Sequence, residues 1–368
     1  MKSSNYIYIA PGGNPHSLKY FQYVLAKSSQ PKVNIIWISF EPFDKKFINK
    51  HKGNINNINL FQVKTLINLF FFSLKLLFTK VKYKIIVQSL ARYLLPLILL
   101  KIKNYPLILY AWGSDIYYTK RLSIAWLLQK IYLKKAKFLV CDSFDMREKL
   151  IQKDVNPKKI KLVFFGTDTA LFSRDSDKYL LGNNQNIQII SSRNHESIYN
   201  LETVLYALEK LSKKGVNFKA IFLGSGTLTH KYKEIISQSK YLDPKKIIFT
   251  GKVGLNEMIR FLKSSDIYIS SALSDAGLAS STAEAMSCGT IPLVSDVREN
   301  SIWVNMSLKT GFLFKARDTD DLLKTILHLL SLSPKEKYEI SENASNLVKK
   351  KLSRKINDEL NSNLLNDL

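Results

Sequence analysis

The segment 274–286 combines small residues, two carboxylates and the start of a predicted helix. It reads SDAGLASSTAEAM and follows an apolar stretch, 267–270, that predicts a buried strand. The first amides of a helix lack intrahelical partners and lie at the positive end of its dipole, so they bind phosphate well. Asp275 in the loop and Glu284 in the helix are nine residues apart, and both can face one ligand. The segment therefore predicts a phosphate site flanked by two carboxylates.

Glu284 also has a purely structural interpretation. Ser281 and Glu284 have the spacing of a capping box, in which the glutamate carboxylate accepts a hydrogen bond from the serine amide. In that case Glu284 would only satisfy a helix amide. The spacing alone leaves both interpretations open.

Two glycine-containing loops follow predicted strands. Gly13 and His16 come after the strand 6–10, where glycine lets a ligand approach the backbone closely. His16 would stand at the start of a helix, where a lone histidine is more often a surface or capping residue than a ligand-binding one. Gly224 and Gly226 follow the strand 219–223 but do not complete a dinucleotide fingerprint, and a tight turn explains them as well as a ligand loop does.

Asp115 lies in the loop Trp112-Gly-Ser-Asp after another predicted strand, 106–111. It is the first acidic residue after a long stretch with none, so it sits in a positive field. A carboxylate at this place either caps a helix that begins near Ile116 or binds a sugar hydroxyl, and capping is the default.

These loops belong to a regular alternation of strands and helices. Strands are predicted at 6–10, 33–40, 84–89, 106–111, 138–141, 161–164, 188–191, 219–223, 247–249, 267–270 and 291–295. Helices are predicted at 17–27, 60–80, 93–101, 123–135, 201–213, 231–240, 256–263, 281–287, 320–332, 335–352 and 354–365. Repeated β-α-β units predict an α/β protein in which helices cover both faces of parallel sheets.

The alternation is interrupted once, by the polar stretch 174–186. With 368 residues, the chain is long enough for two domains, so we predict two Rossmann-like halves with a boundary near 170–185. Ligands of open α/β sheets bind beyond the carboxyl ends of the strands. We expect the two halves to face each other across a cleft, with the functional residues on the strand-to-helix loops.

Composition and charge narrow the class of protein. The two cysteines, Cys141 and Cys288, cannot form a disulfide framework and favour a reducing cytosol. The net charge is +25, from 55 Lys/Arg and 30 Asp/Glu. Such a charge attracts phosphate, nucleic acid or an anionic membrane. No nucleic-acid-binding motif is present, so nucleic acid is not an expected partner.

The basic residues concentrate in 45–114, which holds twelve Lys/Arg and no Asp/Glu. The same region contains the apolar run 69–78, interleaved and followed by Lys75, Lys80, Lys82 and Lys84. This mixture suits an interfacial helix lying on an anionic membrane. Biased codon usage and solvated faces are the alternative, but they do not explain why the second half of the chain is nearly neutral. We therefore predict an anionic membrane surface as a partner of residues 45–114.

Several segments resemble GT-B glycosyltransferases of family 4, which are retaining enzymes that use nucleotide sugars. The segment 267–294, with ALSDAG and AEAMSCGTIPLV, resembles the signature of that family. Supporting matches occur in family order along nearly the whole chain: AWGSDI at 111–116, FGTDTALF at 165–172, Arg193, FLGSG at 222–226, FTGKV at 249–253 and TGFLF at 310–314.

The resemblance implies domains and roles. It implies an acceptor-side domain at 1–172, a donor domain at 185–352 and a C-terminal helix, 353–368, that packs back on the N-terminal domain. Glu284 would bind the nucleotide ribose, and Arg193 with the amides around 278–281 would bind the diphosphate. His16, Asp115 and Asp275 are the implied catalytic residues. The implied donor-binding residues are Gly13, Arg193, Gly224, Gly226, Gly251, Lys252, Val253, Gly277, Leu278, Ala279, Ser280 and Glu284.

The sequence departs from the family pattern at two positions. The first glutamate of the E-x7-E motif falls at Ala276, and Asp275, one position earlier, is the residue that would substitute for it. The lysine expected shortly after Arg193 is missing, because 197–200 reads SIYN, and Lys252 is a candidate replacement.

The sequence thus predicts a hexosyltransferase that uses a nucleotide sugar, with UDP as the expected nucleotide. The expected acceptor is a glycan, lipid-linked, in bacterial surface polysaccharide synthesis: lipopolysaccharide, O-antigen or capsule. No cofactor and no metal are expected, because no acidic pair stands in a convincing metal position. We expect a cytoplasmic protein, peripheral on the inner face of the membrane. The alternatives are a non-catalytic GT-B scaffold that binds nucleotide sugars and a GT-B nucleotide-sugar epimerase.

Overall fold

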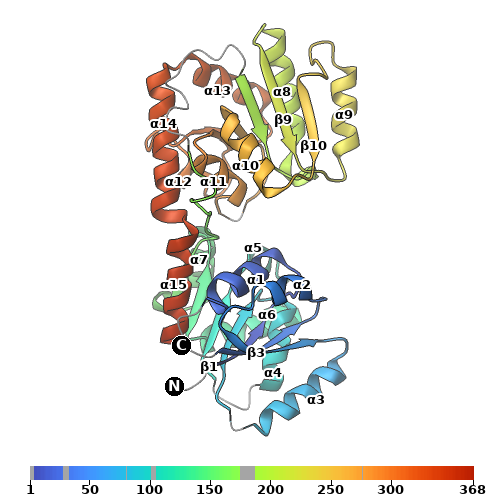
Figure 1. The fold of residues 1–368 in the computed structure, drawn as a ribbon, viewed down its shortest axis with the longest axis vertical. Helices are drawn as coiled ribbons and strands as arrows, with labels where there is room; N and C mark the ends of the chain where they lie inside the picture. The colour runs from blue at the N-terminus through green and yellow to red at the C-terminus, as the bar shows by residue number, and fades with distance from the viewer. Residues whose placement is uncertain (1–3, 28–32, 80, 101–104, 175–186, 276) are drawn as a thin grey trace. The chain divides into compact units, whose positions relative to one another are not determined.

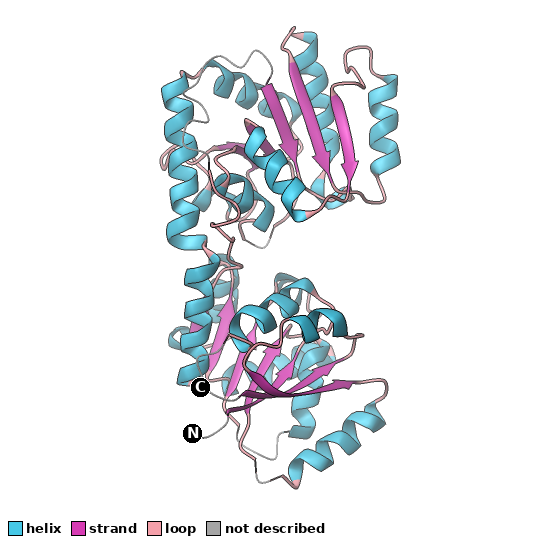
Figure 2. Cartoon of the chain, viewed as in Figure 1, coloured by secondary structure: helices cyan, strands magenta, loops and turns pink. Residues whose placement is uncertain are grey.

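The computed structural model describes residues 4–27, 33–79, 81–100, 105–174, 187–275 and 277–368. The chain divides into two compact units (Figures 1 and 2). Unit 1 consists of residues 1–164 together with 357–368, and unit 2 consists of residues 165–356. Each unit is built around one parallel sheet, so the predicted α/β class with two Rossmann-like halves is confirmed.

Unit 1 has a seven-stranded sheet in the order β3-β2-β1-β4-β5-β6-β7. Its strands are β1 (Ser4–Ile9), β2 (Val33–Ser39), β3 (Ile55–Gln62), β4 (Lys84–Gln88), β5 (Leu107–Tyr110), β6 (Phe138–Cys141) and β7 (Ile160–Leu162). The strand order reverses direction between β1 and β4, and this switch point is where the loops after β1 and β4 diverge.

The helices of unit 1 connect consecutive strands. They are α1 (Pro15–Tyr20) with the π-turn Phe21–Leu25, α2 (Lys45–Lys50), α3 (Leu66–Leu77), α4 (Leu95–Leu100), α5 (Gly113–Tyr117), α6 (Ile124–Lys135) and α7 (Phe144–Gln152). One face of the sheet packs Tyr6, Tyr8 and Trp37 against helix residues that include Phe21 and Ile48.

One predicted helix of unit 1 was wrong. The apolar pattern at 60–80 predicts a single helix, whereas the structure has β3, which ends at Gln62, followed by α3, which begins at Leu66. Thr65 separates them as the helix N-cap, since its hydroxyl accepts a hydrogen bond from the Asn68 amide at 3.2 Å. The apolar run continues through both elements, so hydropathy alone did not show the junction.

Unit 2 has a six-stranded sheet in the order β10-β9-β8-β11-β12-β13. Its strands are β8 (Ile187–Ser191), β9 (Phe218–Leu223), β10 (Ile247–Gly251), β11 (Ile267–Ser270), β12 (Ile291–Ser295) and β13 (Phe312–Phe314). Its helices are α8 (Leu201–Lys213), α9 (Thr229–Gln238), α10 (Leu255–Ser264), α11 (Ser280–Ser287), α12 (Asn300–Trp303), α13 (Thr319–Ser331) and α14 (Pro334–Leu347), which continues into a π-turn, Val348–Leu352.

The last helix, α15 (Arg354–Asp367), contributes residues 357–368 to unit 1. Leu364 and Leu365 are buried in the core of that unit. The Tyr110 hydroxyl donates to Asn361 Oδ1 at 2.8 Å, and the Phe164 amide donates to Asn357 Oδ1 at 2.8 Å. A chain end that returns to the first unit in this way completes the hydrophobic core of that unit.

Candidate functional site

The switch point of the unit 2 sheet brings together two predicted site residues. Strands β8 and β11 are neighbours in the sheet, although α8, β9, α9, β10 and α10 separate them in sequence. Arg193 follows β8 and Asp275 follows β11, so both lie at the carboxyl edge. The Arg193 guanidinium donates to Asp275 Oδ1 at 2.5 Å, and both side chains are largely buried. The two residues form a buried ion pair at the place where α/β sheets bind ligands.

Three further side chains hold the Arg193 guanidinium in place. Its Nη1 donates to Ser281 Oγ at 3.2 Å, and the Tyr268 hydroxyl donates to the same oxygen at 2.9 Å. The Tyr199 ring stacks against the guanidinium, 4.3 Å from its central carbon. Sequence reasoning missed both tyrosines. The only hint was that 197–200 has Tyr199 where the missing lysine was sought.

Within the described residues, the Arg193 Nε is buried and makes no hydrogen bond. A buried guanidinium N–H without an acceptor is costly. The guanidinium therefore retains a donor for an oxyanion, in addition to Nη2, which donates to Asp275. Burial raises the pKa of Asp275, and the Arg193 charge opposes this shift. A phosphate that binds Arg193 competes with this carboxylate for the same N–H groups.

The structure bears on the capping-box interpretation of Glu284. Helix α11 begins at Ser280, its N-cap is Ala279, and this cap has no side-chain hydrogen bond. The Ser281 hydroxyl instead contacts Arg193 and Tyr268. Ser281 is therefore not the N-cap of α11, and the predicted capping box is wrong. Glu284 is half-buried, and its contact with a ribose stays a prediction.

The other predicted residues of the loop before α11 lie together at the helix N-terminus. Gly277, Leu278 and Ala279 are half-buried and Ser280 is exposed. Ala276, where the family glutamate would fall, lies outside the described residues. The loop and α11 thus place backbone amides and the positive helix end beside Arg193.

The glycine loop after β9 is shaped by close backbone contacts. Gly224 has φ of +100°, and its amide donates to the Gly251 carbonyl at 2.8 Å. A Cβ at Gly226 would lie 2.5 Å from the His195 carbonyl oxygen, so only glycine fits there. Gly251 also has a positive φ, while Lys252 is exposed and Val253 half-buried. The loops after β9 and β10 therefore lie side by side at the same edge as Arg193.

His195 fixes this loop and was not predicted. Its ring is fully buried, its Nδ1 contacts Thr229 Oγ1 at 2.8 Å, and its carbonyl accepts from the Leu228 amide at 2.9 Å. Burial lowers the pKa of His195, so the ring is neutral near pH 7. A histidine two positions after Arg193 was the available signal. We regard it as a positioning residue for the glycine loop.

In unit 1, Gly13 and His16 follow β1 at its switch point. Asn14 caps α1 by accepting from the His16 amide at 2.9 Å, which leaves the imidazole outside the cap. The ring is exposed and meets the Trp112 ring edge-on at 5.9 Å. Neighbouring atoms partly desolvate the ring, and this desolvation, together with the Lys19 charge, lowers the pKa of His16. The ring is therefore neutral near pH 7.

Asp115 occupies the third position of helix α5 and ties two loops together. Its carboxylate accepts from the Leu90 amide at 2.5 Å and from the Trp112 amide at 2.9 Å. Only 3% of the residue is exposed. The predicted helix start near Ile116 is wrong, because α5 begins at Gly113 with Trp112 as its N-cap. Asp115 does stabilise the helix start, but as the third residue of the helix, whose carboxylate accepts from the N-cap amide of Trp112. Contact of this carboxylate with a sugar stays a prediction, and its visible function is to position the loops after β4 and β5.

The burial of Asp115 makes stability depend on pH. Burial raises the pKa of Asp115 to about 7, although the hydrogen bonds from the Leu90 and Trp112 amides partly oppose this shift. Between about pH 4 and pH 7 the folded state retains a proton that the unfolded chain has released, so this group lowers stability as the pH rises. We expect Asp115→Asn to gain in unfolding temperature relative to wild type between pH 5 and pH 8. Parallel thermal-unfolding curves for the two proteins across that range would contradict this.

Among the described residues, no three His, Cys, Asp or Glu side chains are grouped so that they could hold a metal ion. In the same part of the chain, no helix is both long and apolar enough to cross a membrane.

Comparisons with known proteins place these features in context. Residues 172–347 match the family model described as Glycosyl transferases group 1. This segment contains Arg193, the glycine loops, Asp275 and α11. An uncharacterized glycosyltransferase of Methanocaldococcus jannaschii is 28% identical over 229 residues, which are 61% of this chain and 57% of that relative.

Solved structures similar to the chain cover nearly its full length. Anabaena HepE, crystallised with UDP, matches with a TM-score of 0.79 and 15% identity, covering 100% of both chains. A glycosyltransferase of Rickettsia africae has a TM-score of 0.76 at 18% identity, covering 99% of this chain and 98% of that one. The lipopolysaccharide outer core galactosyltransferase WaaB has a TM-score of 0.72 at 12% identity, with full coverage of both chains.

At these identities the structural matches establish the fold, which is the GT-B fold. Together with the group 1 match over residues 172–347, they support a GT-B glycosyltransferase.

Proposed function

We propose that the protein is a retaining glycosyltransferase of the family 4 type that transfers a hexose from a UDP-sugar to a glycan acceptor. The observation that carries the proposal is the buried Arg193 at the switch point of unit 2, beside the N-terminus of α11. A guanidinium and helix amides are the groups that bind a diphosphate without a metal. The structures of HepE with UDP and with UDP-glucose support the choice of nucleotide.

In the proposed reaction, Arg193 and the α11 amides bind the diphosphate and stabilise the charge that grows as it leaves. The bond between the anomeric carbon and the diphosphate oxygen breaks, and the acceptor oxygen bonds to the same face of that carbon. The departing phosphate takes the acceptor proton. One preorganised donor of this kind is worth about 10²–10³ in rate. His16 would contact the donor sugar and the acceptor from unit 1, while Glu284 would hold the ribose hydroxyls.

Asp275 has two states in this proposal. With no donor bound, it neutralises Arg193 across 2.5 Å. When the diphosphate takes the guanidinium, the carboxylate is released toward the sugar end of the donor, as the aspartate that replaces the missing family glutamate. The exchange keeps Arg193 paired throughout, because an unpaired buried charge is strongly unfavourable.

A thermal-shift screen of UDP, GDP and their sugars, followed by a turnover assay with EDTA, tests the proposal. We expect UDP and a UDP-sugar to raise the unfolding temperature and transfer to continue in EDTA, since no metal is assigned a role. Loss of transfer in EDTA that Mg²⁺ or Mn²⁺ restores would contradict the metal-independent mechanism. Binding without turnover would favour the scaffold, and release of an epimerised nucleotide sugar without acceptor would favour the epimerase.

We further propose that unit 1 docks on an anionic membrane through α3, beside a lipid-linked acceptor of surface polysaccharide synthesis. Helix α3 buries Leu69 and Leu76, yet it also exposes large apolar side chains: Leu66, Ile67, Phe70 and Phe71, followed by Phe78 just after the helix. Phe71 is 64% exposed and Phe78 is 87% exposed. Exposed aromatic residues among lysines suit insertion at a lipid interface.

The lysines of the predicted cluster differ in their surroundings. Lys75 and Lys82 are exposed, and Lys80 lies outside the described residues. Lys84 is half-buried and donates to the Leu365 carbonyl at 3.1 Å, so its ammonium also helps to hold α15. We therefore test the membrane proposal on Lys75 and Lys82.

Vesicle co-sedimentation tests the membrane proposal. We expect the double variant Lys75→Glu, Lys82→Glu to lose binding to anionic vesicles at low salt, since each basic residue contributes about 1 kcal/mol there. Phe71→Ser should remove the part of the binding that survives high salt, because that part is hydrophobic. Leu308→Ser, at a 49% exposed leucine of unit 2, is the matched control. Wild-type protein that binds neither neutral nor anionic vesicles at low salt would refute the proposal.

A further inference from the structure

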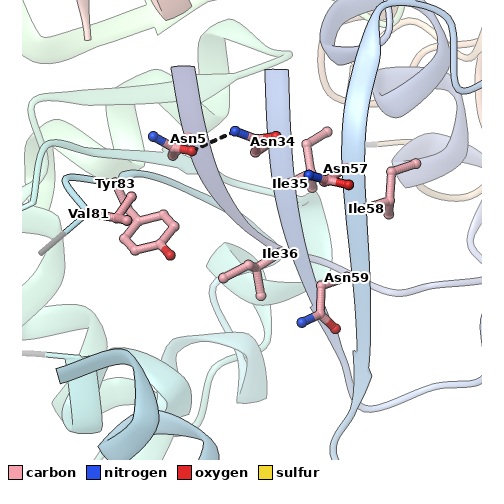
Figure 3. Close-up of a pocket in the computed structure, with 9 residues that line it drawn as sticks. All are labelled: Asn5, Asn34, Ile35, Ile36, Asn57, Ile58, Asn59, Val81 and Tyr83. Atoms are coloured by element: carbon pink, nitrogen blue, oxygen red, sulfur yellow. Dashed lines mark hydrogen bonds between the residues drawn. The ribbon is translucent and has the colours of Figure 1, made fainter. Parts of the chain in front are cut away.

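Unit 1 has a pocket at the amino ends of β1, β2 and β3, away from the carboxyl edge that carries His16 and Asp115. Its volume is about 360 Å³, which suits one or two sugar rings, since ligand pockets start at about 300 Å³. The lining residues include Asn5, Asn34, Asn57, Asn59 and, across from β3, Tyr83 (Figure 3).

The asparagines form a row across three neighbouring strands. The sheet register pairs Asn5 with Asn34 and Asn34 with Asn57, and Asn59 follows two residues along β3, opposite Ile36. Residues two apart on a strand face the same side of the sheet. The four amides therefore line one face, with the half-buried Ile36 side chain among them.

This row is unusual for a parallel sheet. Parallel sheets normally have both faces covered by helices, and asparagine is disfavoured in strands. Here Asn57 and Asn59 are exposed in the interior of β3, even though α3 packs nearby: the Phe72 ring stacks on the Phe61 ring of β3 at 3.9 Å. Helix cover therefore reaches the later part of β3 but not Asn57 and Asn59, which leaves an amide-lined opening.

The hydrogen bonds among the four asparagines leave the Asn57 and Asn59 side-chain amides available to a ligand. Asn34 Nδ2 donates to Asn5 Oδ1 at 2.9 Å, which orients both amides (Figure 3). Within the described part of the chain, the side chains of Asn57 and Asn59 make no hydrogen bond. Each amide offers two donors and an acceptor, which matches hydroxyl groups that both donate and accept.

The pocket offers an anionic ligand no ionic partner among its described lining residues. Residues 45–114 carry twelve Lys/Arg, yet no described lining residue is basic or acidic. The remaining walls are apolar or aromatic: Ile36, Val81 and the half-buried Tyr83 ring. Amides for hydroxyls beside a ring and aliphatic carbon for C–H faces are the chemistry of an uncharged saccharide.

We infer that this pocket is a second carbohydrate site, which binds a neutral mono- or disaccharide unit of a glycan apart from the transfer site. The site uses residues of unit 1 alone and needs no nucleotide. It goes beyond the proposed transferase function, and the two can fail separately.

Ligand-observed NMR and calorimetry with glucose, galactose, mannose, N-acetylglucosamine, maltose and lactose at millimolar concentrations test the inference, with saturating UDP present throughout. We expect at least one of these sugars to bind. The double variant Asn57→Leu, Asn59→Leu should weaken binding about 25-fold, from about fivefold for each lost hydrogen bond. Tyr83→Ala should weaken it as well.

The matched control is Asn56→Leu, at an exposed residue of the same strand that does not line the pocket. It should keep saccharide affinity within about threefold, because its one bond to the row, to Asn34 Oδ1, is long at 3.4 Å. All variants should keep the wild-type circular-dichroism spectrum and thermal unfolding transition, which shows that unit 1 is folded, and unit 2 should still bind UDP as in wild type.

Three results would overturn the inference: no binding of any of the six sugars, unchanged affinity in the Asn57/Asn59 variant, or much tighter binding of glucuronate than of glucose. Tighter binding of glucuronate would mean that the positive charge of residues 45–114, rather than the asparagine amides, selects the ligand. Failure of UDP binding with intact saccharide binding would instead count against the transferase proposal alone.

Discussion

Arg193→Met is expected to lower the rate of sugar transfer about 10²–10³-fold and to weaken UDP binding. The substitution keeps an unbranched apolar side chain of similar shape as far as the Nε position, while removing the guanidinium that we assign to the diphosphate. The magnitude is typical of the loss of one preorganised donor to a developing oxyanion. Initial rates with a radiolabelled UDP-sugar and calorimetry with UDP measure both effects.

This single variant also leaves the buried Asp275 without its partner, and breaking a buried pair costs about 3–5 kcal/mol. The double variant Arg193→Met, Asp275→Asn removes both charges and should recover most of the unfolding temperature. It should remain as inactive as the single variant. If the double variant regains transfer together with stability, Arg193 only holds the fold and the assignment to the diphosphate fails.

Asp275→Asn alone separates the two proposed states of the aspartate. Releasing Arg193 from its ion pair should leave UDP affinity equal to wild type or higher, because the nucleotide no longer competes with a carboxylate. Transfer should nevertheless fall if Asp275 acts near the sugar. An affinity for UDP that drops as far as in Arg193→Met would mean that Asp275 positions Arg193 rather than competing for it.

The sequence was sufficient for the fold class because the alternation of apolar strands and amphipathic helices is a local property. It was insufficient at 60–80, where one apolar run crosses from β3 into α3 and the cap at Thr65 is the only boundary signal. The loops after β9, β10 and β11 were each predicted to follow a strand, because glycine and small residues after an apolar run are a local signal too. That these loops bind a sugar donor stays a prediction.

What the sequence could not show were partners brought together by topology. Arg193 and Asp275 are 82 residues apart, and only the adjacency of β8 and β11 makes them a pair. The same holds for Lys84 and Leu365, which are 281 residues apart and meet because α15 returns to unit 1. Asp115 differs: its type and position suggested a helix cap, but the sequence did not show that α5 begins at Gly113 or that the carboxylate also accepts from the Leu90 amide.

The test of Glu284 has the second large expected effect. Because the N-cap of α11 is Ala279 and not Ser281, Glu284→Ala should leave the start of α11 in place. A carboxylate that accepts hydrogen bonds from ribose hydroxyls contributes about 1.5–3 kcal/mol, so UDP affinity should fall roughly 10- to 150-fold. Glu284→Gln should keep part of it, since the amide oxygen still accepts.

The ribose assignment has a sharper readout in 2′-deoxy-UDP. Wild type should bind this analogue more weakly than UDP, because one carboxylate hydrogen bond is lost. Glu284→Ala should bind both equally weakly, since the group that distinguishes them is gone. Glu257→Ala, at a glutamate in the first turn of α10, is the control and should leave both affinities unchanged. Equal UDP affinity in wild type and Glu284→Ala would end the ribose hypothesis, and a discrimination against 2′-deoxy-UDP that persists in the variant would move the ribose contact to another residue of unit 2.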